Sequence, residues 1–256
     1  FQNQEQVDEY NQYALDQWRA RNPNHPHGYA DNGQPLNADG KEIGIYYQKA
    51  NTSVGDLIYD DNGQGMVNAA SRKYIGNPWP LMTMGINASV AYKGFDIAMV
   101  FSGAFGFDIM NLVKPYTHMF MSDNTTAAIF TTSCFGKDNT TVTENPRVGY
   151  LDADGKVIGD GAANRNYSTV SGYMVEKGDY LKLKNLSIGY TLPQKYSRKA
   201  KMERLRIYFS AQNLFTITKY SGVDPEIGGS SLMYNIDHQN RYLPSRLFSF
   251  GLDLSF

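Results

Sequence analysis

Residues Met84–Phe105, with the sequence MGINASVAYKGFDIAMVFSGAF, decide the fold class. Apolar side chains alternate with small or polar ones through both halves of this stretch, and such alternation predicts two β-strands with unlike faces. Lys93-Gly94 stands between the halves, and a two-residue connection that contains glycine predicts a β-hairpin. This turn places Tyr92 opposite Phe95, so the apolar faces of the two strands coincide.

The two faces of this hairpin differ in chemistry. The apolar face carries Met84, Ile86, Ala88, Val90, Tyr92, Phe95, Ile97, Met99 and Phe101. The opposite face, apart from Val100, carries small or polar residues, namely Asn87, Ser89, Asp96, Ala98 and Ser102. Strands of about 9–11 residues suit a bilayer crossing. Aromatic residues beside the turn match the girdle of a membrane barrel.

A second hairpin with the same alternation follows further along the chain. Apolar residues alternate with small ones over 186–192, and Pro193 ends this strand because proline has no N–H to donate to a sheet. The next strand is predicted over 205–211. The connection between them is basic and contains Lys195, Arg198, Lys199 and Lys201.

The chain ends on a further alternating segment, Phe248–Phe256. One face holds Phe248, Phe250, Leu252, Leu254 and Phe256, and the other holds Ser249, Gly251, Asp253 and Ser255. This pattern predicts a last strand with one apolar face.

Connection lengths differ on the two sides of these strands. One side has short connections, Lys93-Gly94 and 193–203, whereas the other has long ones at 1–80, 106–178 and 218–244. Outer-membrane barrels show this asymmetry, with short periplasmic turns and long extracellular loops. The predicted fold class is all-β, with strands of an antiparallel transmembrane β-barrel. A soluble β-sandwich adhesin, which would bury its apolar faces together, is the alternative that alternation alone leaves open.

Composition excludes several other classes. The 256 residues carry a formal net charge of −1, which argues against a nucleic-acid partner. The single cysteine, Cys134, excludes an internal disulfide and a multi-cysteine metal site. No window approaches the roughly 20 consecutive apolar residues of a membrane helix. The sequence begins at Phe1 without a signal-peptide pattern, so we expect either a processed N-terminus or a start within a longer polypeptide.

One segment departs from the β pattern. Val7, Tyr10, Ala14 and Trp18 recur at helical spacing, which predicts a short amphipathic helix over Glu5–Ala20. We expect its apolar side to pack on the neighbouring loop or on the barrel rim.

No motif predicts catalysis. The sequence has no phosphate-binding loop, no nucleotide-binding glycine pattern and no nucleophile elbow. We therefore expect a protein that is not an enzyme and that has no cofactor, apart from one candidate for calcium.

That candidate is a loop with oxygen-bearing side chains at alternate positions. Asp60, Asn62, Gln64 and Asn68 form a calcium-type pattern, in which a turning chain wraps a hard cation. Gln64 and Asn68 are neutral where a strong site has acids, so the predicted affinity is weak. The alternative is a glycine-rich turn that keeps its shape without metal.

Several stretches of the chain resemble the SusC/RagA-like TonB-dependent transporters of Bacteroidetes outer membranes. In order along the chain they are residues 1–10, GDLIYDDNG at 55–63, IGNPWP at 75–80, YKGFD at 92–96, GDYLKLKNL at 178–186, GYTLP at 189–193, AQNLF at 211–215, GVDPE at 222–226 and RLFSFGL at 246–252. The loop at 55–63 departs from the family pattern at Gln64.

The resemblance implies a barrel of about 22 strands with a plugged lumen. Five or six strands are predicted here, too few to close such a barrel. Residues 1–256 are therefore interpreted as the C-terminal part of the barrel domain, with the plug domain and the TonB box outside this chain. The resemblance further implies that Phe248, Phe250, Leu252, Leu254 and Phe256 form the signal that the barrel-assembly machinery reads.

The resemblance also implies a function, the active import of nutrient oligomers across the bacterial outer membrane by a multi-pass β-barrel. The expected cargo is a glycan, with an oligopeptide as the alternative. The expected partners are a SusD-like surface lipoprotein that covers the barrel and TonB, which displaces the plug. Two transporter–lipoprotein pairs would form a dimer. No cargo-contacting residue is predicted.

One alternative of another class stays open at this point. A small self-contained outer-membrane barrel, acting as a pore or an enzyme, would need about eight or more strands from this chain alone.

Overall fold

The computed structural model describes residues 1–50, 52–118, 146, 150–151, 157–158, 169–230, 232–238 and 242–256. Cys134 lies outside these residues, as does most of the long connection that contains it. The chain forms two compact units. One consists of Phe1–Ile75 with Lys114–Ser171, and the other of Gly76–Val113 with Gly172–Phe256.

The first unit contains the predicted helix as α1, Gln4–Arg21. The side chain of Asn3 accepts a hydrogen bond from the backbone N–H of Gln6 at 2.8 Å. This bond satisfies one of the N–H groups that the start of a helix leaves unpaired. The remaining described elements of this unit are η1 (Ala69–Ser71), most of α2 (Val113–His118), and β4 (Tyr150–Leu151) paired with β5 (Val157–Ile158).

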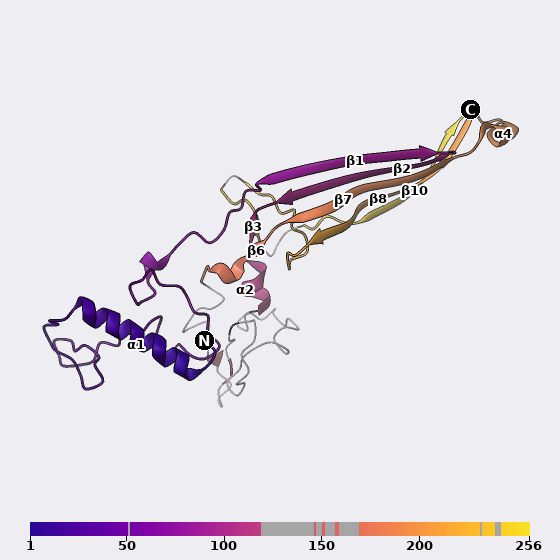
Figure 1. The fold of residues 1–256 in the computed structure, drawn as a ribbon. Coiled ribbons are helices and arrows are strands. Elements are labelled where there is room, and N and C mark those ends of the chain that lie inside the picture. The colour runs from indigo at the N-terminus through magenta and orange to yellow at the C-terminus, as the bar shows by residue number, and fades with distance from the viewer. Residues whose placement is uncertain are drawn as a thin grey trace. The chain divides into compact units, whose positions relative to one another are not determined.

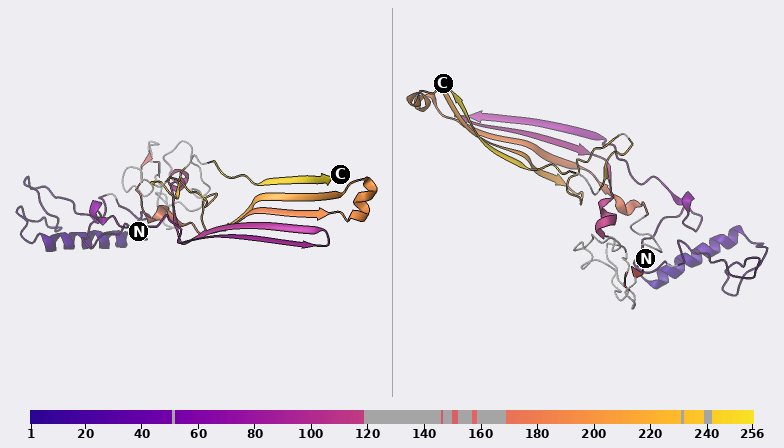
Figure 2. Two further views of the ribbon diagram at one scale, coloured as in Figure 1. Left: turned by 90° about the horizontal axis from the view of Figure 1, so that it is seen from above. Right: turned by 180° about the vertical axis from the view of Figure 1, so that it is seen from behind.

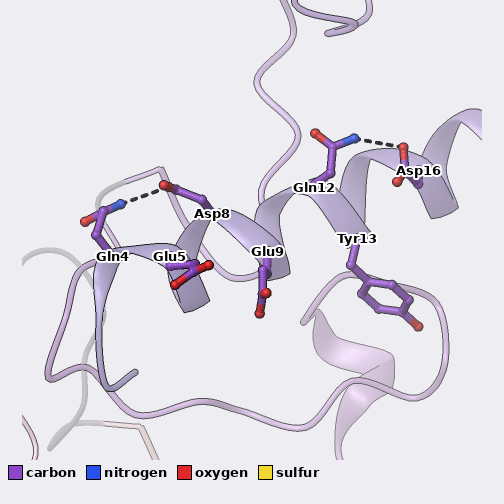
Figure 3. Close-up of a pocket in the computed structure, with 7 residues that line it drawn as sticks. All are labelled: Gln4, Glu5, Asp8, Glu9, Gln12, Tyr13 and Asp16. Atoms are coloured by element: carbon purple, nitrogen blue, oxygen red, sulfur yellow. Dashed lines mark hydrogen bonds between the residues drawn. The ribbon is translucent and has the colours of Figure 1, made fainter.

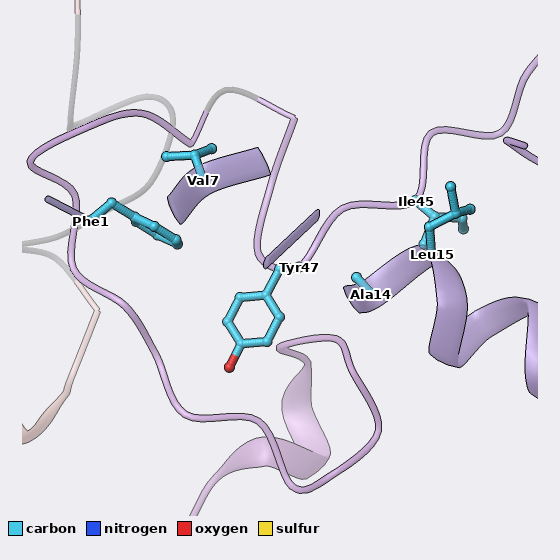
Figure 4. Close-up of a cluster of buried hydrophobic side chains, with 6 residues drawn as sticks. All are labelled: Phe1, Val7, Ala14, Leu15, Ile45 and Tyr47. Carbon is cyan, nitrogen blue, oxygen red and sulfur yellow. The ribbon is translucent and has the colours of Figure 1, made fainter. Parts of the chain in front are cut away.

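The apolar side of α1 packs against the chain that follows it (Figure 4). The buried cluster consists of Phe1, Val7, Ala14, Leu15, Ile45 and Tyr47. Tyr10 and Trp18 pack against this cluster, and the ring of Tyr10 meets that of Tyr47 edge-on at 4.7 Å between centroids. The helix and its packing on a neighbouring loop are therefore as predicted.

The second unit is dominated by one antiparallel sheet of five strands (Figures 1 and 2). Its order is β1-β2-β7-β8-β10, so β1 and β10 form its edges and the described strands do not close a barrel. The strands are β1 (Met82–Tyr92), β2 (Phe95–Phe105), β7 (Tyr180–Thr191), β8 (Arg204–Thr218) and β10 (Leu247–Ser255). A complete small barrel is therefore absent from the part of the chain that the structure describes.

The first hairpin has the predicted register. Tyr92 pairs with Phe95 and Val90 with Ile97. Lys93 and Gly94 both have positive φ, 48° and 90°, which is the geometry of a tight hairpin turn that matches the twist of its strands.

The pairing register continues the apolar side and the polar side of this hairpin across all five strands. On one side lie three aligned rows, Val90–Ile97–Ile188–Phe209–Phe250, Tyr92–Phe95–Tyr190–Ile207–Leu252 and Ala88–Met99–Leu186–Ala211–Phe248. On the other side lie the rows Ser89–Ala98–Ser187–Ser210–Ser249 and Ala91–Asp96–Gly189–Tyr208–Gly251. We call these sides the apolar face and the polar face.

The apolar face is uncovered. Val90 is 67% exposed and Phe250 is 83% exposed, although both belong to an aligned apolar row. A β-sandwich would bury such a face against a second sheet, and within the described residues no sheet covers it.

Strands β7 and β8 are longer than the sequence pattern predicts. The register shifts between Val100 and Phe101 on β2, where Lys184 of β7 has no paired residue on the neighbouring strand. It shifts again between β7 and β8, where Asn213 has a positive φ of 51°. These β-bulges move apolar residues from even to odd positions in β7, so strict alternation ends at the bulge although the strand continues.

A smaller sheet lies at the loop end of the long strands. It has the order β6-β3-β9, from Val175–Lys177, Asp108–Asn111 and Ile236–Asp237. Ala104, Phe107, Ile109, Tyr180, Tyr220 and Ile227 form a buried cluster beside it. The remaining turns are η2 (Gly172–Met174), α4 (Gln194–Ser197) and η3 (Arg198–Ala200). Among the described residues, no helix has both the length and the apolar character to cross a bilayer.

Candidate functional site

The polar face is the candidate functional surface, because it offers groups that can hydrogen-bond to water or to a polar ligand. Its Ser–Ala–Ser–Ser–Ser row runs straight across the sheet. Such a row has small side chains and hydroxyls that both donate and accept hydrogen bonds. The neighbouring row of the polar face contains the charged Asp96, the aromatic Tyr208 and two glycines, Gly189 and Gly251.

An ion pair crosses this face over the central strand. Arg206 of β8 donates from Nε and Nη2 to the two carboxylate oxygens of Asp96 on β2, at 3.0 and 2.6 Å. Strand β7 lies between them, and its residue at this level is Gly189. A Cβ atom at Gly189 would stand 2.5 Å from Arg206 Nη2 and 2.6 Å from Asp96 Oδ1. The missing side chain therefore makes room for a bidentate pair between strands that are not neighbours.

A second glycine makes room for an aromatic ring on the same face. Gly251 of β10 lies opposite Tyr208 of β8, and a Cβ atom there would collide with the tyrosine ring. The guanidinium carbon of Arg206 stands 5.0 Å from the centroid of that ring. Ion pair and ring therefore form one fixed group on the polar face.

At the loop end, buried charges fasten a loop to strand β7. The Nζ atom of Lys182 contacts Asp224 Oδ2 at 2.6 Å and Glu226 Oε2 at 3.1 Å. Its side chain is only 2% exposed. Lys184 contacts the same Glu226 at 2.5 Å. A buried ammonium is tolerated when it is paired in this way, so the loop that contains the GVDPE stretch is held in one position.

The protonation of Glu226 follows from this environment. Burial alone would raise the pKa of the Glu226 carboxyl, but the hydrogen bonds from Lys184 and Lys182 outweigh it and hold that pKa below its ordinary value. The loop contact is thus a contact between ionised groups.

The predicted assembly strand is β10, paired with β8. Phe248, Phe250, Leu252 and Leu254 lie on the apolar face, and Phe256 follows the end of the strand. The geometry expected of the signal residues is present in β10. Their role in barrel assembly stays a prediction.

The predicted calcium loop uses its polar groups within the turn. Asp60 pairs with Lys73, Asn62 donates to the carbonyl of Ala70 at 3.2 Å, and Asn68 caps η1. The carbonyl of Gln64 accepts a hydrogen bond from Arg21. Within the described ranges, no group of three or more His, Cys, Asp or Glu side chains is arranged to hold a metal. These contacts stabilise the turn, and the calcium site stays a prediction.

This loop is also tied to the α1 cluster. Asp61 Oδ2 accepts from the backbone N–H of Gly65 at 2.5 Å, and the hydroxyl of Tyr47 donates to the carbonyl of Tyr59 at 2.9 Å. Burial, and then the charge of Asp61, raise the pKa of Tyr47 to about 12. The phenol therefore stays neutral and keeps its proton to donate.

A shallow pocket runs along the exposed side of α1 (Figure 3). It is lined by Gln4, Glu5, Asp8, Glu9, Gln12, Tyr13 and Asp16. Gln4 donates to Asp8 and Gln12 to Asp16, each at 2.9 Å. Such bonds one turn apart stabilise a helix, and we assign this surface that role.

The ion pair of Asp96 with Arg206 and the network of Lys182 were not predicted from the sequence. Gly189 was a usable signal for the first, because it interrupts an otherwise apolar and serine-rich strand. The second joins two of the stretches that carry the family resemblance, GDYLKLKNL and GVDPE, but sequence alone does not show that they meet.

Comparison with known proteins agrees with this architecture. No family model matches the sequence. The chain is 34% identical over 212 residues to TonB-dependent receptor P3 of Formosa agariphila, covering 79% of the chain and 19% of that receptor. It is 24% identical over 212 residues to TonB-dependent receptor SusC of Bacteroides thetaiotaomicron, covering 82% of the chain and 18% of SusC. The chain therefore spans about a fifth of the length of the curated relatives it matches.

Solved structures give the same result for the fold. The RagAB peptide transporter matches with a TM-score of 0.60 and 24% identity, over 84% of this chain and 23% of that one. The closed-closed state of the RagAB peptide importer matches with a TM-score of 0.54 and 22% identity, over 86% and 20%. The predicted fold class is confirmed: the antiparallel sheet has the fold of part of a large transporter barrel.

These matches define the class first, a TonB-dependent receptor of the outer-membrane barrel type. Within that class, the predicted resemblance to the SusC/RagA-like receptors of Bacteroidetes is confirmed.

Proposed function

We propose that this chain is part of the wall of an outer-membrane importer that takes up nutrient oligomers with energy from TonB. The observation that carries the proposal is the register of the sheet, which keeps an uncovered apolar face and a serine-lined polar face in line over five strands. A barrel wall in a membrane needs this arrangement, with lipid on one side and an aqueous lumen on the other. Similarity to TonB-dependent receptors supports the same function.

The proposed cargo is a glycan, with an oligopeptide as the second candidate. The name of the RagAB peptide transporter favours the second candidate, whereas the stronger sequence match carries no cargo in its name. The polar face, rich in hydroxyls, with one bidentate ion pair and one tyrosine, can hydrogen-bond to either class. The protein would bind and translocate cargo without chemical conversion, so it acts as a transporter and not as an enzyme.

The proposed partners follow from the same class. A SusD-like surface lipoprotein would cover the barrel from outside, and TonB would act through a plug outside the present residues. The barrel-assembly machinery would read β10, and two transporter–lipoprotein pairs would form a dimer. Similarity to SusC and to the RagAB structures supports the pairing with a lipoprotein.

The test is uptake by cells of the source organism with and without the gene that encodes this chain. Fluorescent glucose, mannose and xylose oligomers are compared with a library of fluorescent oligopeptides, in the presence and absence of a protonophore. We expect the wild type to accumulate one class in the outer-membrane-enclosed space, and both gene loss and protonophore to abolish this accumulation. Uptake that is unchanged in the deletion strain for every probe would contradict the proposal.

A further inference from the structure

Cations gather at the end of the sheet where the connections are short. Figure 1 shows α4 beyond the ends of β7 and β8, at the same end as the C-terminus. The exposed cations of the two short connections are Lys93, Lys195, Arg198, Lys199 and Lys201. Glu203 is the single carboxylate in these connections. Five positive charges against one negative charge stand out in a chain whose net charge is −1.

Three lysines at the other end of the sheet are paired with carboxylates. Lys177 contacts Asp108 at 2.8 Å, and Lys182 and Lys184 contact Asp224 and Glu226. None of the five turn-end cations takes part in an ion pair with the described residues. Their charge is therefore available to an anionic partner.

The position of these cations identifies the partner. The apolar face ends at this level with the aromatic row that contains Tyr92, Phe95 and Tyr190. Lys93 Nζ lies 5.1 Å from the centroid of the Tyr92 ring, and that ring is 66% exposed on the apolar face. Along the strands towards this end, apolar rows are followed by aromatic rings and then by cations. Side chains have this order at a boundary between membrane and water.

The same order is present at the second short connection. Leu192 N donates to the carbonyl of Leu205 at 2.8 Å, closing the apolar end of β7 against β8. Pro193 ends the strand, and α4 with η3 then supplies four cations within seven residues, 195–201. Tyr196 lies among them and is 56% exposed. Amphipathic tyrosine and long lysine and arginine side chains suit the headgroup layer.

We propose that Lys93 and the cations of α4 and η3 bind the headgroups of anionic phospholipids at the short-turn side of the membrane. The proposal rests on the membrane location given under the proposed function. Lysine is a compact point charge on a flexible stem, and four of the five cations are lysines. Several such charges side by side fit a negatively charged surface, which attracts each of them in turn.

The test uses the full-length protein purified from outer membranes and reconstituted into nanodiscs of phosphatidylglycerol or phosphatidylcholine. The variant K195Q/R198Q/K199Q/K201Q removes four turn-end cations. The control K41Q/K49Q/R72Q/K219Q removes three lysines and one arginine that are exposed elsewhere and have no ion pair with the described residues. Native mass spectrometry then measures competition between phosphatidylglycerol and phosphatidylcholine for retained lipid.

We expect the wild type and the control to retain phosphatidylglycerol preferentially. In the turn variant, the preference for phosphatidylglycerol over phosphatidylcholine should be at least about tenfold lower. High salt should weaken the wild-type preference because salt screens exposed charges. Equal preference in variant and control, no preference in the wild type, or displacement of the lipid by inorganic phosphate at equal concentration would each overturn the proposal. Heat-modifiable migration on gels shows whether each variant is folded. Uptake and membrane fractionation of the wild type are measured separately. Failure of the proposed function would appear in those two measurements, whereas failure of the lipid proposal would appear only in the retained lipid.

Discussion

The apolar face and the polar face belong to the same five strands but are built by different means. On the apolar face, large side chains stand in line and remain exposed, for example Phe250 at 83%. On the polar face, the large groups Arg206 and Tyr208 fit only because Gly189 and Gly251 leave space beside them. The apolar face is therefore specified by repetition of residue type, whereas the polar face is specified by individual contacts. Single substitutions on the apolar face should therefore each lower stability by a similar amount. On the polar face, only substitutions at particular residues should lower stability strongly.

The largest effect is expected from K182A, which removes the buried partner of two carboxylates. Loss of one member of a buried ion pair costs about 3–5 kcal/mol, because the remaining charge is left uncompensated. The control is K177A, since the Lys177 side chain is 70% exposed in its pair with Asp108, and such a pair is worth about 0–1 kcal/mol. Urea unfolding in lipid vesicles measures both. Equal destabilisation would show that burial of Lys182 does not matter.

The next effect breaks the apolar face directly. I188K places a charge in an aligned apolar row, which costs about 2–4 kcal/mol at the middle of a bilayer. S187K changes the adjacent position, which faces the polar side, and should cost much less. The measurement is the yield of folded barrel in vesicles. If S187K lowered the yield of folded barrel more than I188K, the assignment of the two faces would be wrong.

A smaller effect tests the space at the central glycine. G189A introduces a Cβ atom 2.5 Å from Arg206 Nη2 and should destabilise by about 1–3 kcal/mol, the usual cost of overpacking. G85A is the control, because the nearest atom to a Cβ there is 3.9 Å away. Thermal unfolding of both variants checks the prediction, which fails if G189A is as stable as G85A.

In the first unit, D61A should cost about 1 kcal/mol through loss of the hydrogen bond from Gly65 N–H. D61N keeps an acceptor oxygen and should retain most of the stability. The same thermal unfolding measurement, with and without calcium, examines the loop of Asp60, Asn62, Gln64 and Asn68. A rise in the unfolding temperature on adding calcium would support a metal site, and its absence would favour the self-contained turn.

The smallest effect is expected from pH, through Glu226. Its folded pKa lies below the ordinary 4.5, so its stabilising contribution is complete above that value and is lost as pH falls through the lower, folded pKa. E226Q should flatten this acid loss. Unfolding measured from neutral to acidic pH checks the sign, and stability that rises on acidification would contradict it.

The sequence predicted those parts of the fold that rest on periodicity. Alternation and a two-residue turn predicted the register of β1 and β2, and helical spacing predicted α1. The alternating pattern in β7 ends at the bulge beside Lys184, because a bulge changes which positions share a face. The strand was therefore predicted shorter than it is. The small sheet β6-β3-β9 was not predicted, since its strands have only two to four residues.

The candidate site was less accessible from sequence. Asp96 and Arg206 are 110 residues apart and meet only because three strands are in register. Lys182 reads as one polar residue in an alternating strand, and only the fold shows that a loop covers it. Pairwise contacts of this kind depend on topology, which periodicity does not encode.

The proposed function requires that one face of the sheet meets lipid and that the other does not. Its most direct test uses the full-length protein in nanodiscs, with Cys134 and any cysteine outside the present residues replaced by serine. A fluorophore is attached to F209C or S210C, which are neighbours on opposite faces of β8. Lipids with nitroxide groups in their acyl chains quench fluorophores that contact the bilayer. We expect strong quenching at residue 209 and weak quenching at residue 210. Equal quenching at both positions, or stronger quenching at 210, would contradict it.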